Sequence, residues 1–139
     1  MEKNQTLVPM AKTFAVRIIR LCVAIQDSGK RFVLANQLLR AGTSIGANIH
    51  EANYASSRAD FINKFQIALK ECYETSYWLE VFRDAEVISE SDYRVLSTDC
   101  NKIRKMLTAS IRTAKSHLIP PKKREADCTA TGKETAERQ

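Results

Sequence analysis

Proline is absent from most of this chain, and that absence restricts the folds that the chain can adopt. The 110 residues between Pro9 and Pro120 contain no proline, and the whole chain of 139 residues has four glycines. Folds with many short strands use these two residue types for their turns. The sequence therefore favours long helices, and its length fits one domain that can bury its own core. We predict an all-α fold.

Apolar residues recur at spacings of three and four in four segments, as expected for helices that bury one face. We predict helices over residues 9–27, 31–54, 57–85 and 89–118. The short connections between them favour an antiparallel up-and-down four-helix bundle over residues 1–118. The remaining residues, 119–139, have almost no large apolar side chains, so we expect a disordered polar tail there.

Capping residues support these boundaries. Pro9 suits the first turn of a helix, and Gly29 suits the left-handed residue that ends one. Ser57, followed three residues later by Asp60, and Ser89 are predicted N-caps. The buried faces are predicted to be Phe14, Ile18, Leu21, Cys22 and Ile25 in the first helix; Leu34, Leu38, Ala41, Ile45, Ile49 and Ala52 in the second; Phe61, Phe65, Ala68, Cys72, Thr75, Leu79 and Phe82 in the third; and Leu96, Cys100, Ile103, Leu107, Ile111, Ala114 and Leu118 in the fourth.

Two glycines, Gly42 and Gly46, lie inside the second predicted helix. Each costs about 1 kcal/mol relative to alanine in a helix interior. We predict that another helix approaches closely at this point. A phosphate-binding loop is the alternative, but no strand precedes these glycines and no Gly-Lys-Ser/Thr follows them.

The third predicted helix is apolar over more than one face. A second stripe consists of Ile62, Leu69, Tyr73 and Tyr77. A helix with so much apolar circumference needs more than one packing partner. In a bundle of four helices, this surplus predicts a subunit interface.

Basic residues are concentrated near the end of the chain, which carries a net charge of +6. From residue 94 to 124 there are nine basic residues, and Asp99 is the only acid. At about 100° per residue, Arg94, Lys105 and Arg112 project in nearly the same direction on the fourth helix. Such a stripe fits contact with nucleic-acid phosphates without base readout. A solvated helix face remains the alternative. The predicted contact residues are Arg94, Lys102, Arg104, Lys105, Arg112, Lys115, Lys122, Lys123 and Arg124, with Arg17 and Arg20 of the first helix as additions.

No catalytic or metal-binding constellation is apparent. The chain has two histidines, His50 and His117, and neither belongs to a Glu-x-x-His or His-x-x-x-His motif. Cys22, Cys72 and Cys100 are expected to be core residues rather than redox or metal ligands. We therefore predict no catalytic residue, no metal, no cofactor and no enzymatic activity. A bundle enzyme is an alternative.

No apolar run is long enough to span a membrane, and the first ten residues lack the apolar stretch of a signal peptide. These features predict a cytoplasmic protein without a membrane partner.

A polar row on the second helix consists of Arg40, Ser44, Asn48 and Glu51. Such a row beside an apolar seam often fixes the register between helices through hydrogen bonds. Its candidate partners on the third helix are Lys64, Lys70, Glu71 and Glu74.

Residues 37–79 resemble a known family. The matching segments are QLLRAGTSIGANIHEA, SSRADFINKFQIALKE and ET-x-YWL. They are similar to the bacterial four-helix-bundle proteins encoded in intervening sequences of 23S ribosomal RNA. The resemblance covers residues 14–118 in length and layout and does not include the tail.

The resemblance implies a cytoplasmic homopentamer without established enzymatic activity. Some relatives are accessory proteins that bind nucleic acid and a reverse transcriptase, so RNA, DNA, a reverse transcriptase and another protein are candidate partners. A protein scaffold that docks an acidic partner, with no nucleic-acid role, is the alternative function. The family's pattern is matched at Arg40, Ser44, Gly46, Asn48, Glu51, Asp60, Phe61, Lys64, Lys70, Glu71, Glu74 and Trp78. We expect these residues to join the second and third helices and to build the subunit interface.

Overall fold

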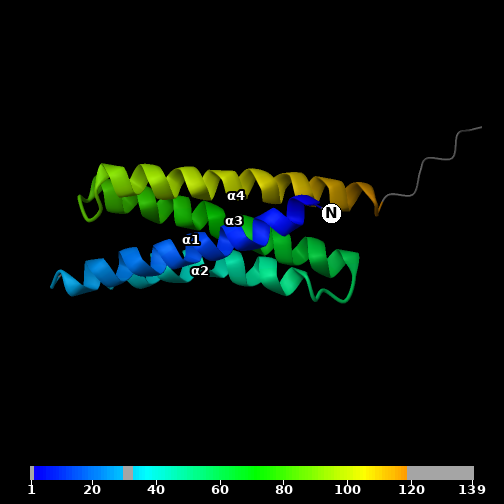
Figure 1. Cartoon of the computed structure of the whole chain (residues 1–139), viewed down its shortest axis with the longest axis horizontal. Coiled ribbons are helices and arrows are strands. Elements are labelled where there is room, and N and C mark those ends of the chain that lie inside the picture. Colours follow the sequence, from blue (N-terminus) through cyan, green and yellow to red (C-terminus); the bar gives the residue numbers. More distant parts are fainter. Residues whose placement is uncertain (1, 30–32, 119–139) are drawn as a thin grey trace, which may run out of the picture.

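The computed structural model describes residues 2–29 and 33–118, with side chains from Thr6 onward. Within these ranges the chain forms four helices and no strand. They are α1 (Glu2–Asp27), α2 (Ala35–Ala52), α3 (Arg58–Asp84) and α4 (Glu90–Ser116). Consecutive helices run in opposite directions, and each packs against two others in the cyclic order α1–α2–α3–α4 (Figure 1). The predicted all-α up-and-down bundle is therefore confirmed.

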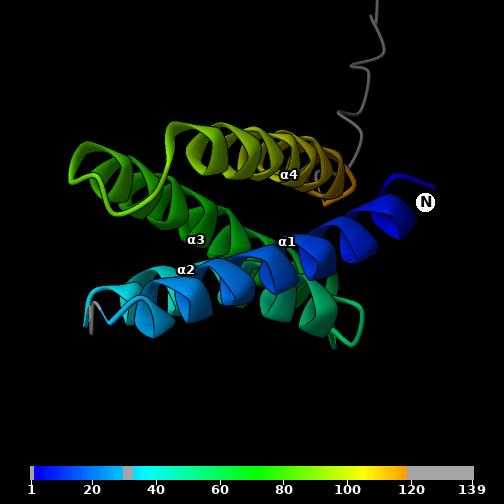
Figure 2. The same cartoon turned by 60° about the vertical axis from the view of Figure 1, so that its left-hand side comes forward.

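The four contacts between neighbouring helices in this cycle are not equally extensive. Helices α2 and α3 share the most extensive contact, and α1 and α4 share the least. Figure 2 shows α4 lying close to the N-terminal half of α1 and away from its C-terminal half. The α1–α4 seam is thus the most open side of the bundle.

The core consists largely of the residues that periodicity predicts. Leu21 and Phe61 are partly buried, and the other predicted core residues of α1 and α3 are buried. Predictions for Leu34 and Leu118 are wrong, because these side chains are 40% and 51% exposed. Leu34 precedes α2 and Leu118 follows α4, so neither lies on a helical turn that faces the core. The buried residues not predicted are Leu7, Ala11, Ala35, Gly42, Ile62 and Ile88.

The predicted start of the first helix is also wrong. Helix α1 begins at Glu2, so Pro9 lies two turns inside it and cannot donate the usual hydrogen bond. Leu7 and Ala11 flank Pro9 and are both fully buried, whereas Pro9 itself is exposed. Burying a leucine contributes about 1.5–3 kcal/mol, which is comparable to the cost of an internal proline. The free energy of burying the core residues around Pro9 thus offsets the cost of this proline, and α1 continues past it.

The other helix ends follow the capping signals. Gly29 has a φ of 77° after α1, as expected for a left-handed terminal residue. The hydroxyl oxygens of Ser57 and Ser89 accept hydrogen bonds from the backbone N–H groups of Asp60, at 3.1 Å, and Asp92, at 3.0 Å. Helix α2 begins at Ala35 rather than Arg31, and Arg31 lies outside the described residues.

The two glycines of α2 lie where α1 approaches. A Cβ atom on Gly42 would come within 2.9 Å of the Ile18 side chain, and one on Gly46 would lie 3.4 Å from the Ala11 carbonyl oxygen. The prediction of close helix approach is therefore confirmed.

The tail over 119–139, which includes Lys122, Lys123, Arg124 and Cys128, lies outside the described residues. None of the described helices is long and apolar enough to cross a membrane.

Candidate nucleic-acid interface

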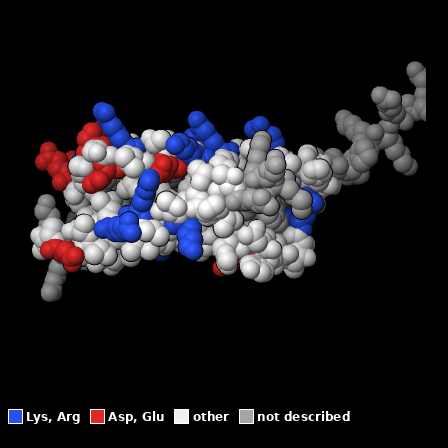
Figure 3. All heavy atoms as spheres, viewed as in Figure 1, with Lys and Arg blue, Asp and Glu red and all other residues white. Residues whose placement is uncertain are grey.

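The solvent side of α4 carries a row of basic side chains, which we call the α4 basic stripe. It consists of Arg94, Lys102, Arg104, Lys105, Arg112 and Lys115. All except Arg104 are exposed, while the buried residues of α4 point to the opposite side. Figure 3 shows Lys and Arg side chains projecting along the edge of the molecule formed by α4. The structure thus places the described members of the predicted set on one helix face.

Most of these cations form no ion pair with a residue that the structure describes. Arg94 pairs with Glu90 at 3.3 Å, one turn earlier on the same helix. Within the described part of the chain, Lys102, Lys105 and Arg112 form no ion pair, and neither does Lys115. An exposed cation without a protein partner can contact an external anion without first breaking a salt bridge. The central part of the stripe is therefore open to anions.

Arg104 differs from the rest of the stripe because it lies against α3. Its guanidinium lies over the ring of Tyr73, 5.7 Å from the ring centre, and its Nε donates a hydrogen bond to the Asn101 side chain at 3.3 Å. A cation in this position is attracted by the ring electrons. Arg104 therefore marks the edge where α4 meets α3.

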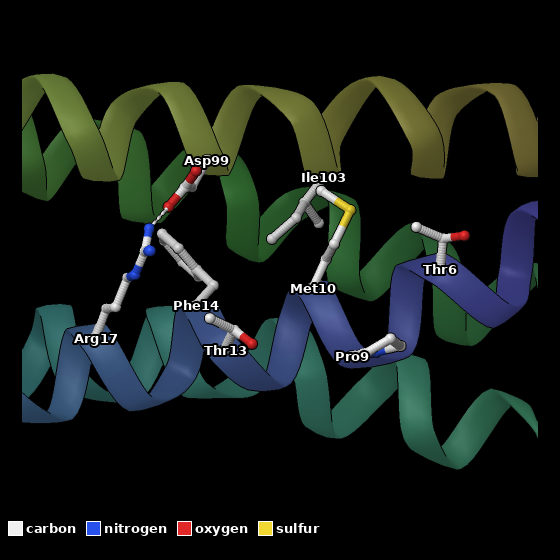
Figure 4. A pocket seen from close by; sticks show the side chains of 8 residues that line it. All are labelled: Thr6, Pro9, Met10, Thr13, Phe14, Arg17, Asp99 and Ile103. Atoms are coloured by element: carbon white, nitrogen blue, oxygen red, sulfur yellow. Dashed lines mark hydrogen bonds and ion pairs between the residues drawn. The ribbon is translucent and has the colours of Figure 1, made fainter.

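Asp99 is the one acid within the stripe's sequence, and it faces α1. It forms an ion pair with Arg17 across the α1–α4 seam (Figure 4). This pair removes Asp99 from the stripe but also engages Arg17, so Arg17 is not an unpaired addition to the basic surface. Arg20 is exposed. Acidic side chains gather instead near the connection from α3 to α4, at one end of the stripe (Figure 3).

A cavity of about 300 Å³ lies in the α1–α4 seam. Figure 4 shows Met10, Phe14 and Ile103 around it, with the pair Arg17–Asp99 at one end. Its charged groups bind each other, and its remaining lining is mainly apolar.

The two histidines lie apart from this cavity's lining. His50 contacts the ring of Tyr54, and His117 is the C-cap residue of α4. No group of three or more His, Cys, Asp or Glu residues suited to a metal ion occurs among the described residues.

A second charged region joins α2 to α3, and we call it the α2–α3 ion-pair cluster. It consists of Arg40, Glu51, Lys64, Glu71 and Glu74. Arg40 pairs with Glu74 and, at 3.4 Å, with Glu71, while Lys64 pairs with Glu51 at 2.6 Å. The hydrogen bond from Arg40 lowers the pKa of Glu74, and the hydrogen bond to Glu51 raises the pKa of Lys64.

The other residues matched to the family's pattern have varied surroundings. Trp78 donates its indole N–H to Glu74 at 3.3 Å, and the rings of Phe61 and Phe65 lie 4.3 Å apart. Ser44 and Asn48 donate hydrogen bonds to carbonyl oxygens of α2 itself, those of Arg40 and Ser44, rather than to α3. Lys70 is exposed and has no ion pair with a described residue. Three of the four candidate partners on α3, namely Lys64, Glu71 and Glu74, thus meet residues of α2, and Lys70 does not.

Sequence reasoning missed one surface feature. Val16, Ile19 and Val23 form an exposed line on α1, which we call the α1 apolar stripe, with 39%, 44% and 47% exposure. Their spacing of three and four residues is a sequence pattern that indicates a second apolar face on α1. It was missed because α1 already has a complete core-facing side.

The chain is similar to a known protein family and to a solved structure. The model of the 23S rRNA-intervening sequence protein family matches residues 3–109. A crystal structure of a protein of unknown function from the S23 ribosomal protein family of Bacteroides thetaiotaomicron is 46% identical, with a TM-score of 0.77. The alignment covers 79% of this chain and 98% of that one. No protein in the curated set shows significant similarity.

Proposed function

The chain belongs to the 23S rRNA-intervening sequence protein family, and from that premise we propose that it is a non-enzymatic, oligomeric bundle that binds RNA or DNA through α4. The observation that supports this proposal is the set of exposed basic residues on α4 that form no ion pair with a described residue. Lys102, Lys105 and Arg112 are central to it. Each phosphate they neutralise releases counterions, which favours binding irrespective of sequence.

The shape of the stripe supports phosphate contact over base readout. Lys105 and Arg112 are seven residues apart and so lie about 10 Å apart along the helix axis. They can therefore meet different phosphates of one backbone. The residues between them on the same side, Thr108 and Ala109, are small and exposed, which leaves the cations accessible. Lys122, Lys123 and Arg124 extend this basic sequence and are part of the proposal.

We propose further that the protein assembles with copies of itself, as the homopentamer implied by the resemblance. The α1 apolar stripe offers a contact surface for such assembly, because exposed apolar side chains in a row favour burial by a partner. Ile19→Glu should shift the mass measured by light scattering toward the monomer. Arg20→Glu, a change at the next position on another side of α1, serves as control. An unchanged mass for Ile19→Glu would assign the contact elsewhere.

The binding proposal is tested by fluorescence anisotropy with nuclease-treated protein, a labelled structured RNA and a labelled duplex DNA. Salt is varied from about 50 to 200 mM, because several phosphate contacts cost orders of magnitude in affinity over that range. We expect binding with a steep salt dependence. Absence of binding at the lowest salt would overturn the proposal and favour a scaffold that docks an acidic protein. Cytoplasmic location and a reverse-transcriptase partner remain parts of the proposal to be tested in cells.

A further inference from the structure

Two exposed tyrosines lie beside the α4 basic stripe. Tyr73 and Tyr77 are one turn apart on α3 and are 55% and 58% exposed. The surplus apolar stripe predicted for α3 is otherwise accounted for within the bundle, since Ile62 is buried and Leu69 packs against the core. The two tyrosines are therefore the part of that stripe that the monomer leaves uncovered.

Contacts between α3 and α4 fix where these rings lie. Ser76 contacts the Cys100 thiol at 3.7 Å, and the Arg83 guanidinium lies 4.0 Å from the centre of the Tyr93 ring. In two antiparallel helices this register brings Tyr73 level with Arg104, whose guanidinium lies over its ring. Tyr73 remains more than half exposed despite that contact.

Charges around the rings favour an anionic ligand at Tyr73. Lys105 follows Arg104 on α4 and is exposed, and Lys70 precedes Tyr73 by one turn on α3 and is also exposed. Glu80 is exposed and lies three residues after Tyr77, where it would repel a phosphate. Tyr73 is therefore better placed than Tyr77 for a ligand that is both aromatic and anionic.

We propose that this face binds single-stranded nucleic acid, with bases stacked on Tyr73 and Tyr77 and phosphates on the α4 basic stripe. The inference rests on the proposed function and narrows its ligand. Every base presents an aromatic face, so stacking on protein rings is tolerant of sequence. A duplex hides those faces within its own stack and leaves only its phosphates for the stripe.

Anisotropy with the full chain tests the proposal. The probes are one labelled oligonucleotide of mixed sequence, used alone and annealed to its complement. Tyr73→Leu/Tyr77→Leu should weaken binding of the single strand about tenfold or more and leave duplex binding unchanged. Tyr73→Phe/Tyr77→Phe keeps the rings and should bind like the parent. Of the single changes, Tyr73→Leu should have the larger effect.

Tyr54→Leu is the matched control, because Tyr54 is 78% exposed and lies in the α2–α3 connection away from this face. Equal loss for both probes, or no loss for the leucine variant, would overturn stacking while leaving phosphate binding intact. Parent protein that binds neither probe would overturn the proposed function and this inference with it. Light scattering that shows a smaller assembly for the leucine variant would identify the face as a subunit contact and also overturn the inference.

Discussion

Two faces of the bundle use the same kind of basic side chain in different ways. In the α2–α3 ion-pair cluster, Arg40 and Lys64 each meet a carboxylate on the facing helix. On the α4 basic stripe, Lys105 and Arg112 meet no described acid. A count of basic residues does not separate the two cases. The difference shows that a cation paired with a carboxylate of the facing helix holds the two helices together. A cation without such a partner is available to bind a ligand.

The largest effect is expected from a variant that reverses the charge of two residues in the α4 basic stripe. Lys105→Glu/Arg112→Glu should weaken binding of RNA or DNA by about 100-fold, because two phosphate contacts are replaced by two repulsions. Thermal stability should change little, since both side chains are exposed. Anisotropy and thermal unfolding measure the two effects.

Lys12→Glu/Arg58→Glu is the matched control for net charge. Both residues are exposed and lie on α1 and α3, outside the stripe. Affinity that falls equally in this control would show that overall charge, rather than the α4 face, determines binding.

A second test concerns how α2 is held in place. Gly42→Val should lower the free energy of unfolding by about 2 kcal/mol, because the added side chain overlaps Ile18 in the buried α1–α2 contact. Gly46→Ala should be neutral or stabilising by up to about 1 kcal/mol, since its Cβ would make ordinary contacts and alanine favours helix. Urea unfolding compares the two variants, and equal effects would refute the close approach at Gly42.

A third test removes a paired cation. Arg40→Met should lower the free energy of unfolding by about 1 kcal/mol or less, because it leaves Glu71 and Glu74 without their partner at a partly exposed site. Nucleic-acid affinity should not change. Lys105→Met provides the opposite pattern, with weaker binding and unchanged stability. A loss of affinity in Arg40→Met would contradict the division between the two faces.

The smallest expected effect is a pH dependence from Glu74. Its pKa is lowered in the folded protein by the hydrogen bond from Arg40, so its contribution to stability is present above the unfolded-state pKa of about 4.5. That contribution is lost as the pH falls through the lower, folded-state pKa. Solvent screening keeps it below about 1 kcal/mol. Parent protein should therefore lose slightly more stability than Glu74→Gln between pH 6 and pH 3, and parallel urea-unfolding curves would contradict this.

Periodicity predicted the bundle well because core burial dominates its energetics. The seam from Phe65 to Phe82 and the core positions of α4 up to Ala114 follow directly from helical spacing. Pro9 was misjudged because local propensity does not include the burial of Leu7 by neighbouring helices. The burial of Leu34 and Leu118 was predicted wrongly because a periodic pattern does not show that α2 begins after Leu34 and that α4 ends before Leu118.

The candidate site was predictable in part. Projection around α4 placed Lys105 and Arg112 together, because a single helix has a known geometry. The ion pair between Arg17 and Asp99 joins residues 82 positions apart and depends on how α1 crosses α4. The position of Arg104 over Tyr73 likewise depends on the register between two helices. Contacts of this kind are set by tertiary packing rather than by spacing along the chain.

The most direct test of the central claim is the salt dependence of binding in the parent and in Lys105→Gln/Arg112→Gln. The slope of log affinity against log salt counts the phosphates that are neutralised. If these two side chains contact phosphates, the slope should become shallower by about 2, or about 1 for each residue removed. An unchanged slope would show that Lys105 and Arg112 do not contact the nucleic acid, and it would contradict the account.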